Sequence, residues 1–182
     1  MRLRYKHGLW ALMLLAGWQL GQAGYIHAKA RLAQHLLDGA WQRTLTGEAQ
    51  VRPWPWADTW PVARLQVPRL GIDQVVLHGA TGSSLAFGPG HLSGSALPGE
   101  SGSIILSGHR DTHFAFLEQL QTGDLVALTG PSGSRQPYRM VQGQVLDARK
   151  QRLTIEDGDQ RLLLLTCYPF DAVRAGGEWR YV

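Results

Sequence analysis

The sequence contains a single cysteine, Cys167, at the end of the apolar run Leu162–Thr166. Short apolar runs bounded by turn residues are typical of buried strands, so we expect the thiol at the carboxyl end of a strand. A thiol acts as a nucleophile only as thiolate, which requires a base or a positive charge nearby. A lone cysteine is also among the residue types most often buried in a core. Whether Cys167 is an inert core residue or a nucleophile for acyl transfer therefore depends on which other residues accompany it.

Histidine is the first candidate for the base, and the C-terminal two thirds of the chain contain His78, His91, His109 and His113. Of these, His109 follows the apolar run Ser103–Ser107 as Cys167 follows its own run. If the two runs are adjacent strands, both residues lie at one rim of the sheet, and Gly108 leaves room for a substrate backbone. Each residue alone is more often structural, but their matched positions favour a catalytic pair.

Acyl transfer also requires groups that orient the histidine and stabilise an oxyanion. The sequence contains no asparagine, so Asp111 is the candidate for the orienting role, with a turn as its structural alternative. Arg174 and Arg180 both follow the cysteine and could supply fixed positive charge. Arg180 is preferred, because it lies in the strand-like segment Trp179–Val182 and a strand aims a side chain more reliably than a loop.

The N-terminus combines a basic head, residues 1–8, with an uncharged stretch over residues 9–26. At 1.5 Å per residue this stretch reaches about 27 Å, close to the thickness of a bilayer core. We therefore predict that residues 1–26 form a single-pass inner-membrane anchor, with a cytoplasmic N-terminus and an extracytoplasmic, periplasmic C-terminal domain. A signal peptide cleaved near Ala28-Lys29-Ala30 is the alternative.

Residues 27–61 are predicted to form a helical stalk followed by a linker. Apolar residues recur at helical spacing up to Leu45, and three prolines alternate with three tryptophans between Pro53 and Pro61. Such proline density favours an extended segment. The tryptophans either contact a carbohydrate or membrane surface or, as we favour, attach the linker to the domain by burying their rings.

Residues 62–182 are predicted to form the functional domain. Abundant glycine and about eight short apolar segments predict a mainly β domain, a closed or nearly closed barrel. The expected elements are strands at Ala63–Val67, Ile72–Leu77, Ser103–Ser107, Asp124–Leu128, Tyr138–Leu146, Leu153–Glu156, Arg161–Thr166 and Trp179–Val182, and a short helix at Ala115–Leu120.

Composition excludes two classes of partner. The net charge is only +4, and no cluster of Lys and Arg forms a basic patch, so nucleic-acid binding is not predicted. The cysteine and histidine spacings contain no metal-binding pattern, so no metal site is predicted.

Four motifs occur in the order and at the spacing of one known family. They are Gly88-Pro-Gly-His91, Leu97-Pro-Gly-Glu100, Ser107-Gly-His-Arg-Asp-Thr-His-Phe114 and Leu165-Thr-Cys-Tyr-Pro-Phe170. Residues 62–182 thereby resemble the sortase family, above all its class D-like and proteobacterial members. The resemblance implies an eight-stranded β-barrel with short helices, here following a transmembrane helix. It matches His109 to the family's histidine, Cys167 to its nucleophile and Arg180 to its arginine on the last strand.

The resemblance also implies an activity and its partners. A membrane-anchored sortase cleaves a C-terminal sorting motif similar to Leu-Pro-x-Thr-Gly through a cysteine thioester, and passes the acyl group to an amine to attach proteins to the cell surface. No cofactor is implied, and calcium dependence is undetermined. Two alternatives stay open from the residues: an exported cysteine peptidase that hydrolyses without transfer, and a non-catalytic barrel that binds peptides.

Overall fold

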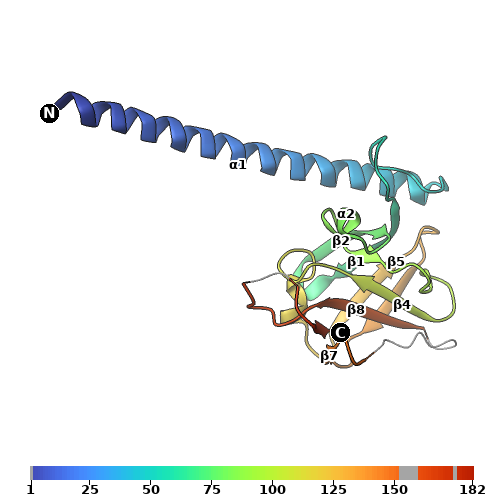
Figure 1. Ribbon diagram of the computed structural model, residues 1–182. Coiled ribbons are helices and arrows are strands. Elements are labelled where there is room, and N and C mark those ends of the chain that lie inside the picture. The colour runs from blue at the N-terminus through green and yellow to red at the C-terminus, as the bar shows by residue number, and fades with distance from the viewer. Residues whose placement is uncertain (1, 152–159, 174–175) are drawn as a thin grey trace. The chain divides into compact units, whose positions relative to one another are not determined.

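The structure is a computed structural model that describes residues 2–151, 160–173 and 176–182, and the side chains of residues 2–7 and 11 are not described (Figure 1). The chain divides into two compact units, residues 1–35 and residues 36–182. The strand predicted at Leu153–Glu156 and the candidate Arg174 lie outside the described residues.

A single helix, α1 (Arg2–Leu45), occupies the first unit and continues into the second. Among the described residues, no helix combines the length and the apolar character needed to cross a membrane. The transmembrane helix predicted within residues 1–26 is therefore not supported. Polar Gln19 and Gln22, together with the glycines around them, dilute an otherwise apolar stretch.

The second unit begins with the last turns of α1, which pack on the domain. Leu37 and Trp41 are 0% and 1% exposed and form a cluster with Val75 and Leu77 of strand β2 (Ile72–His78). Burying side chains of this size stabilises a contact by a few kcal/mol, about 1.5–3 kcal/mol for each. The helix end is therefore part of the folded domain.

Two of the three tryptophans in the proline-rich segment attach it to the domain. Trp54 meets the edge of Phe87 at a centroid distance of 4.9 Å, and Trp60 stacks on His78 at 4.1 Å. Trp56, in contrast, is 82% exposed. The segment is thus fastened at both ends, and its middle faces solvent.

Nine strands of the described residues form one curled sheet in the order β6-β5-β1-β2-β3-β4-β8-β9-β7 (Figure 1). With β2 given above, they are β1 (Pro61–Val67), β3 (Gly90–His91), β4 (Ser103–Ser107), β5 (Leu125–Thr129), β6 (Arg135–Arg139), β7 (Val145–Asp147), β8 (Arg161–Cys167) and β9 (Trp179–Tyr181). The short helices are α2 (Gly82–Leu85) and two 3₁₀ turns, Pro68–Leu70 and Ala115–Gln119. All but one of the strands expected within the described residues are confirmed to within two residues at either end.

The predicted eight-stranded barrel is confirmed only as a half-barrel. The segment expected as one strand, Tyr138–Leu146, is instead divided between β6 and β7, which are the two free edges of the sheet. Pro137 in β6 has no N–H to donate, so β6 is suited to an edge. The short strand β3 was not among the expected strands, because a two-residue segment becomes a strand only through its pairing with β2 and β4.

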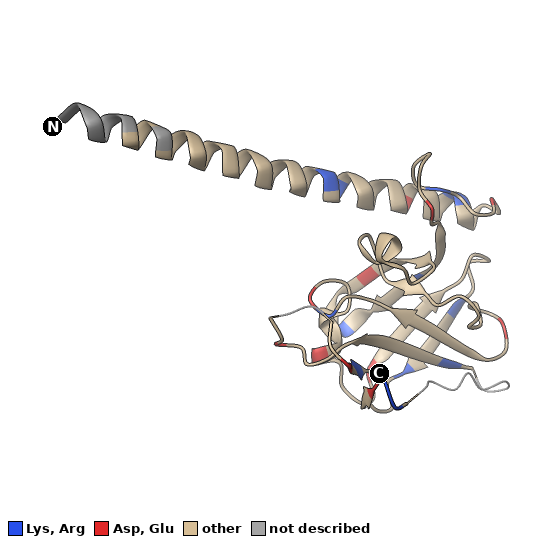
Figure 2. Ribbon diagram, viewed as in Figure 1, with Lys and Arg blue, Asp and Glu red and all other residues tan. Residues whose placement is uncertain are grey.

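The main core fills the inside of the half-barrel. Its members come from most strands and from the segment after β4, and include Leu65, Val76, Leu106, Phe114 and Leu128. Figure 2 shows acidic and basic residues interspersed over the domain. Arg64 joins strand and helix by ion pairs to Asp38 and Asp73, at 2.8 Å and 2.5 Å.

Replacement of Trp41 tests whether the end of α1 belongs to the domain. We expect Trp41→Ala to lower the free energy of unfolding by about 3–5 kcal/mol, because it leaves a cavity between helix and sheet. Urea unfolding followed by circular dichroism measures this change. Trp56→Ala removes the same side chain from an exposed position and is the control, with an expected change below about 0.5 kcal/mol. Equal losses in the two variants would contradict the assignment.

Candidate active site

Strands β4 and β8 bring the two candidate catalytic residues to one rim of the sheet. They pair in parallel, with Ser107 opposite Leu165. Cys167 lies two residues beyond Leu165, and His109 lies two residues beyond Ser107. The expected adjacency of the two strands is therefore confirmed. Cys167 is partly buried and His109 is exposed.

Hydrogen bonds around Gly108 hold the two strand ends together. The hydroxyl of Thr166 donates to the Gly108 carbonyl at 2.7 Å, and the Gly108 N–H donates to the Leu165 carbonyl at 3.1 Å. A Cβ at position 108 would lie 2.7 Å from the Phe114 ring, closer than side chains approach. Glycine is therefore required there because the backbone passes directly against a core phenylalanine.

The backbone of His109 is fixed by the loop that follows it. Its carbonyl accepts hydrogen bonds from the N–H of Phe114 at 2.9 Å and of Thr112 at 3.3 Å. Phe114 is fully buried in the main core. The His109 imidazole is therefore exposed, but its backbone is held in place by the core through Phe114.

Arg180 occupies the centre of β9, directly opposite Cys167 in an antiparallel pair. Directly opposite side chains share a face of the sheet, with Cβ atoms about 5 Å apart. On its other side β9 pairs with β7, where Leu146 is opposite Arg180. The Arg180 Nη1 donates to the carbonyls of Gly177 at 2.8 Å and Trp179 at 2.9 Å.

The other candidates lie elsewhere. Asp111 is exposed and has no hydrogen bond or ion pair among the described residues, so no contact supports an orienting role. His91 is buried, with its Nε2 at 2.9 Å from the Ala96 carbonyl and 3.0 Å from the Ser95 hydroxyl, and serves the fold. His78 stacks on Trp60, away from the strand ends that carry the site.

His113 is a second imidazole beside the candidate base. Burial lowers the pKa of His113, a hydrogen bond with the Ala86 backbone opposes this, and the neighbouring His109 lowers it further. Its backbone carbonyl accepts a hydrogen bond from the Gln74 amide at 3.1 Å. The environment of His113 therefore favours the neutral form of its imidazole.

Sequence reasoning did not single out two residues that the structure places at the site, Thr166 and Arg110. Thr166 carries the hydroxyl that joins the strand ends, and Arg110 is a buried cation that bonds to the loop after the cysteine. Both adjoin the predicted pair in sequence. Thr166 and Arg110 lie within the same sequence motifs as Cys167 and His109, and this position could have identified them as site residues.

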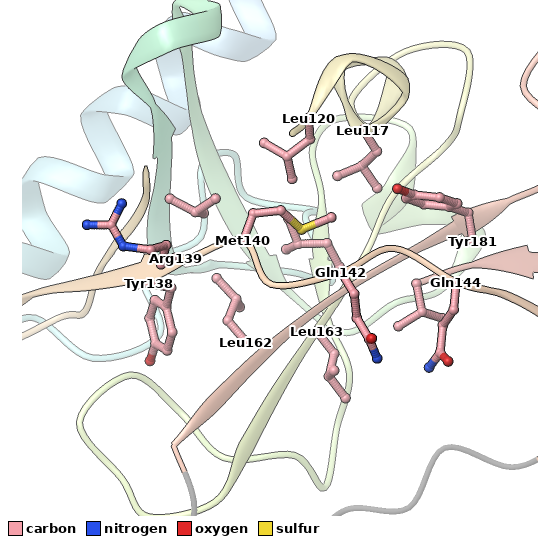
Figure 3. A pocket seen from close by; sticks show the side chains of 13 residues that line it. Leu117, Leu120, Tyr138, Arg139, Met140, Gln142, Gln144, Leu162, Leu163 and Tyr181 are labelled. Atoms are coloured by element: carbon pink, nitrogen blue, oxygen red, sulfur yellow. The ribbon is translucent and has the colours of Figure 1, made fainter. Parts of the chain in front are cut away.

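A cavity lined mainly by apolar side chains lies beside β8, upstream of Cys167 (Figure 3). Its volume is about 130 Å³. Leu117, Leu120 and Met140 line one side and Leu162 the other, and Tyr181 closes one end. A cavity of this kind accepts an apolar side chain. No group of described residues forms a metal site.

Comparison with known proteins agrees with this geometry. Residues 65–182, more than half of the chain, match the sortase domain. The chain belongs to the sortase family. It is therefore a member of a family of cysteine transpeptidases, as the motifs predicted.

Individual relatives extend this result. Sortase D of Bacillus subtilis (strain 168) is 34% identical over 110 residues, which cover 60% of this sortase and 55% of that protein. The match thus spans about half the length of the curated relative. A Clostridium perfringens sortase D5 transpeptidase matches with a TM-score of 0.64 and 20% identity, over 83% of this chain and 94% of that chain. Sortase A from Corynebacterium diphtheriae matches with a TM-score of 0.60 and 22% identity, over 82% and 80%.

The hydroxyl of Thr166 offers a direct test of the site's architecture. We expect Thr166→Val in this sortase to lower the free energy of unfolding by about 1–3 kcal/mol, because it leaves the Gly108 carbonyl without its donor. We also expect a roughly 10- to 100-fold loss of kcat in peptide transfer, since the two strand ends lose their connection.

The matched control is Thr59→Val. Thr59 is equally buried and donates to the His78 carbonyl at 2.7 Å, but it lies away from the site. It is expected to cost similar stability at unchanged kcat. If Thr166→Val and Thr59→Val lose kcat equally, the proposed role of the Thr166 hydroxyl in connecting the two strand ends is contradicted.

The lowered pKa of His113 predicts a pH dependence of stability. Because its pKa in the folded state lies below that in the unfolded chain, the unfolded state binds more protons as the pH falls below about 6.5. Stability is therefore complete above that pH and declines as the pH falls towards the folded pKa. Thermal unfolding at pH 7.5 and pH 5.0 measures the decline, which should be smaller in His113→Gln. An equal decline in both proteins would contradict the prediction.

Proposed function

We propose that this sortase is a transpeptidase that cleaves a C-terminal sorting motif similar to Leu-Pro-x-Thr-Gly and transfers the new acyl end to an amine. The observation that carries the proposal is the parallel pairing of β4 and β8, which presents His109 and Cys167 at one rim. The substrates are proteins with such a motif, and the product is a protein joined to an amine at the cell surface.

Cys167 is the proposed nucleophile. The thiol gives its proton to His109, the thiolate sulfur attacks the carbonyl carbon of the scissile peptide bond, and the carbonyl oxygen takes up the negative charge. When the tetrahedral intermediate collapses, the C–N bond breaks and His109 gives a proton to the leaving amine. A thioester remains. An incoming amine then attacks the same carbon, gives its proton to His109, and expels the thiolate.

Arg180 is proposed to stabilise the oxyanion and to orient the substrate. A guanidinium has five N–H donors, and the hydrogen bonds that Arg180 makes among the described residues use only its Nη1. Its Nε and Nη2 are therefore able to donate to a substrate carbonyl. The cross-strand pairing with Cys167 supports this role, because directly opposite side chains share a face of the sheet.

The transfer reaction is tested with the full chain, a Leu-Pro-x-Thr-Gly-type peptide and triglycine. We expect mass spectrometry to detect a ligated product, and no product above background with Cys167→Ala or His109→Gln. His35→Gln, an exposed histidine on α1, is the matched control and should retain activity.

Three results would contradict the proposed transpeptidation through Cys167. Cleavage without ligation at saturating triglycine would indicate a hydrolase. Ligation that persists in Cys167→Ala would exclude the thioester. Binding of the peptide without any reaction would indicate a non-catalytic peptide-binding domain.

A further inference from the structure

Arg110 is a buried cation that joins the two loops of the site. It follows His109 directly and is only 7% exposed. Its Nη1 donates to the Pro169 carbonyl at 2.9 Å, and its Nη2 donates to the Ala172 carbonyl at 2.6 Å. Both acceptors belong to the loop between β8 and β9. A side chain from the histidine loop therefore holds the loop that follows the cysteine.

Burial of an arginine is unusual unless its donors are satisfied, because removing the charge from water is costly. Here the planar guanidinium meets two carbonyl oxygens of one loop with two different nitrogens, a geometry that a single ammonium group cannot reproduce. The Ala172 N–H also donates to the Pro169 carbonyl, at 3.4 Å. The loop thus presents its carbonyls to Arg110 in a fixed turn.

Cys167 lies between two such attachments. Before it, the hydroxyl of Thr166 donates to the carbonyl of Gly108. After it, Arg110 holds Pro169 and Ala172. Each attachment links the strand end that carries the cysteine to the strand end that carries His109. The backbone of the cysteine is therefore fixed from both sides against that of the histidine.

We propose that Arg110 is a positioning residue for the transfer reaction, which holds the loop after Cys167 so that the thiol stays aligned with His109. The role rests on the proposed transpeptidation. Arg110 does not touch the reacting atoms. It acts through the backbone of residues 168–172. A displacement of about 1 Å at reacting atoms is enough to cost about 100-fold in rate.

The test compares Arg110→Met and Arg110→Lys with the wild-type full chain in the peptide transfer assay, well below each protein's unfolding temperature. Methionine keeps the length and apolar stem but removes both donors. Lysine keeps the charge but can reach one carbonyl at a time. We expect kcat to fall about 100-fold in the methionine variant and about tenfold in the lysine variant, with KM within about threefold of wild type.

The matched control is Arg64→Met. Arg64 is also partly buried and also bridges two elements, but it lies on strand β1, away from the site. It should lose stability while keeping kcat. If Arg110→Lys retains full kcat, or if Arg110→Met loses no more than Arg64→Met, the positioning role is overturned.

Hydrogen exchange followed by mass spectrometry supplies a readout that needs no activity. We expect the amides of Tyr168 and Ala172 to exchange at least about tenfold faster in both Arg110 variants than in wild type or Arg64→Met, while β4 is unchanged. Unchanged exchange at these amides would overturn the proposal. Should the wild-type protein form no ligated product, the proposed function fails, and the exchange rates still decide whether Arg110 holds the loop.

Discussion

The parallel pairing of β4 and β8 is the constraint on which the site depends. Two neighbouring parallel strands run in the same direction, so their carboxyl ends lie at the same edge of the sheet. The residues that follow the two strands are therefore brought to one rim. The register places Ser107 opposite Leu165, and it therefore sets His109 level with Cys167. A shift of one residue would turn every side chain of β8 to the other face and remove the thiol from its partner.

Residues of the hydrophobic core also hold the candidate site in place. Phe114 is buried in the half-barrel, lies against Gly108, and donates its N–H to the carbonyl of His109. Folding of the core thus positions the histidine backbone, and no flexible loop has to do so. The loop after Cys167 is held in the same manner by Arg110. The geometry of the candidate site in this sortase is therefore a consequence of buried contacts, while the side chain of His109 is exposed.

Strand β9 is stabilised by pairing with its two neighbouring strands, because it is too short to be stable alone. Three residues would form a weak strand alone, but β9 lies between β8 and β7. Beyond the ladder, the Gln144 and Val182 backbones exchange two hydrogen bonds at 2.9 Å, and Arg149 pairs with Glu178. Arg180 is thus held in a defined position opposite Cys167. The half-barrel needs no closure between its free edges to build this part of the site.

Local patterns along the chain were enough to predict most of the short strands and the family. The limits of β4 and β8, and the positions of Cys167 and His109 just past their ends, follow from apolar runs and turn residues, which are local signals. Tertiary structure decided what depends on contacts between distant segments. These are the pairing of β3, the division of residues 138–146 between two edges, and the bonds of Arg110 and Thr166 across the site. Hydrophobic periodicity reports which residues are buried, but a polar side chain acquires its partner only when the chain has folded, and no pattern along the sequence records that partner.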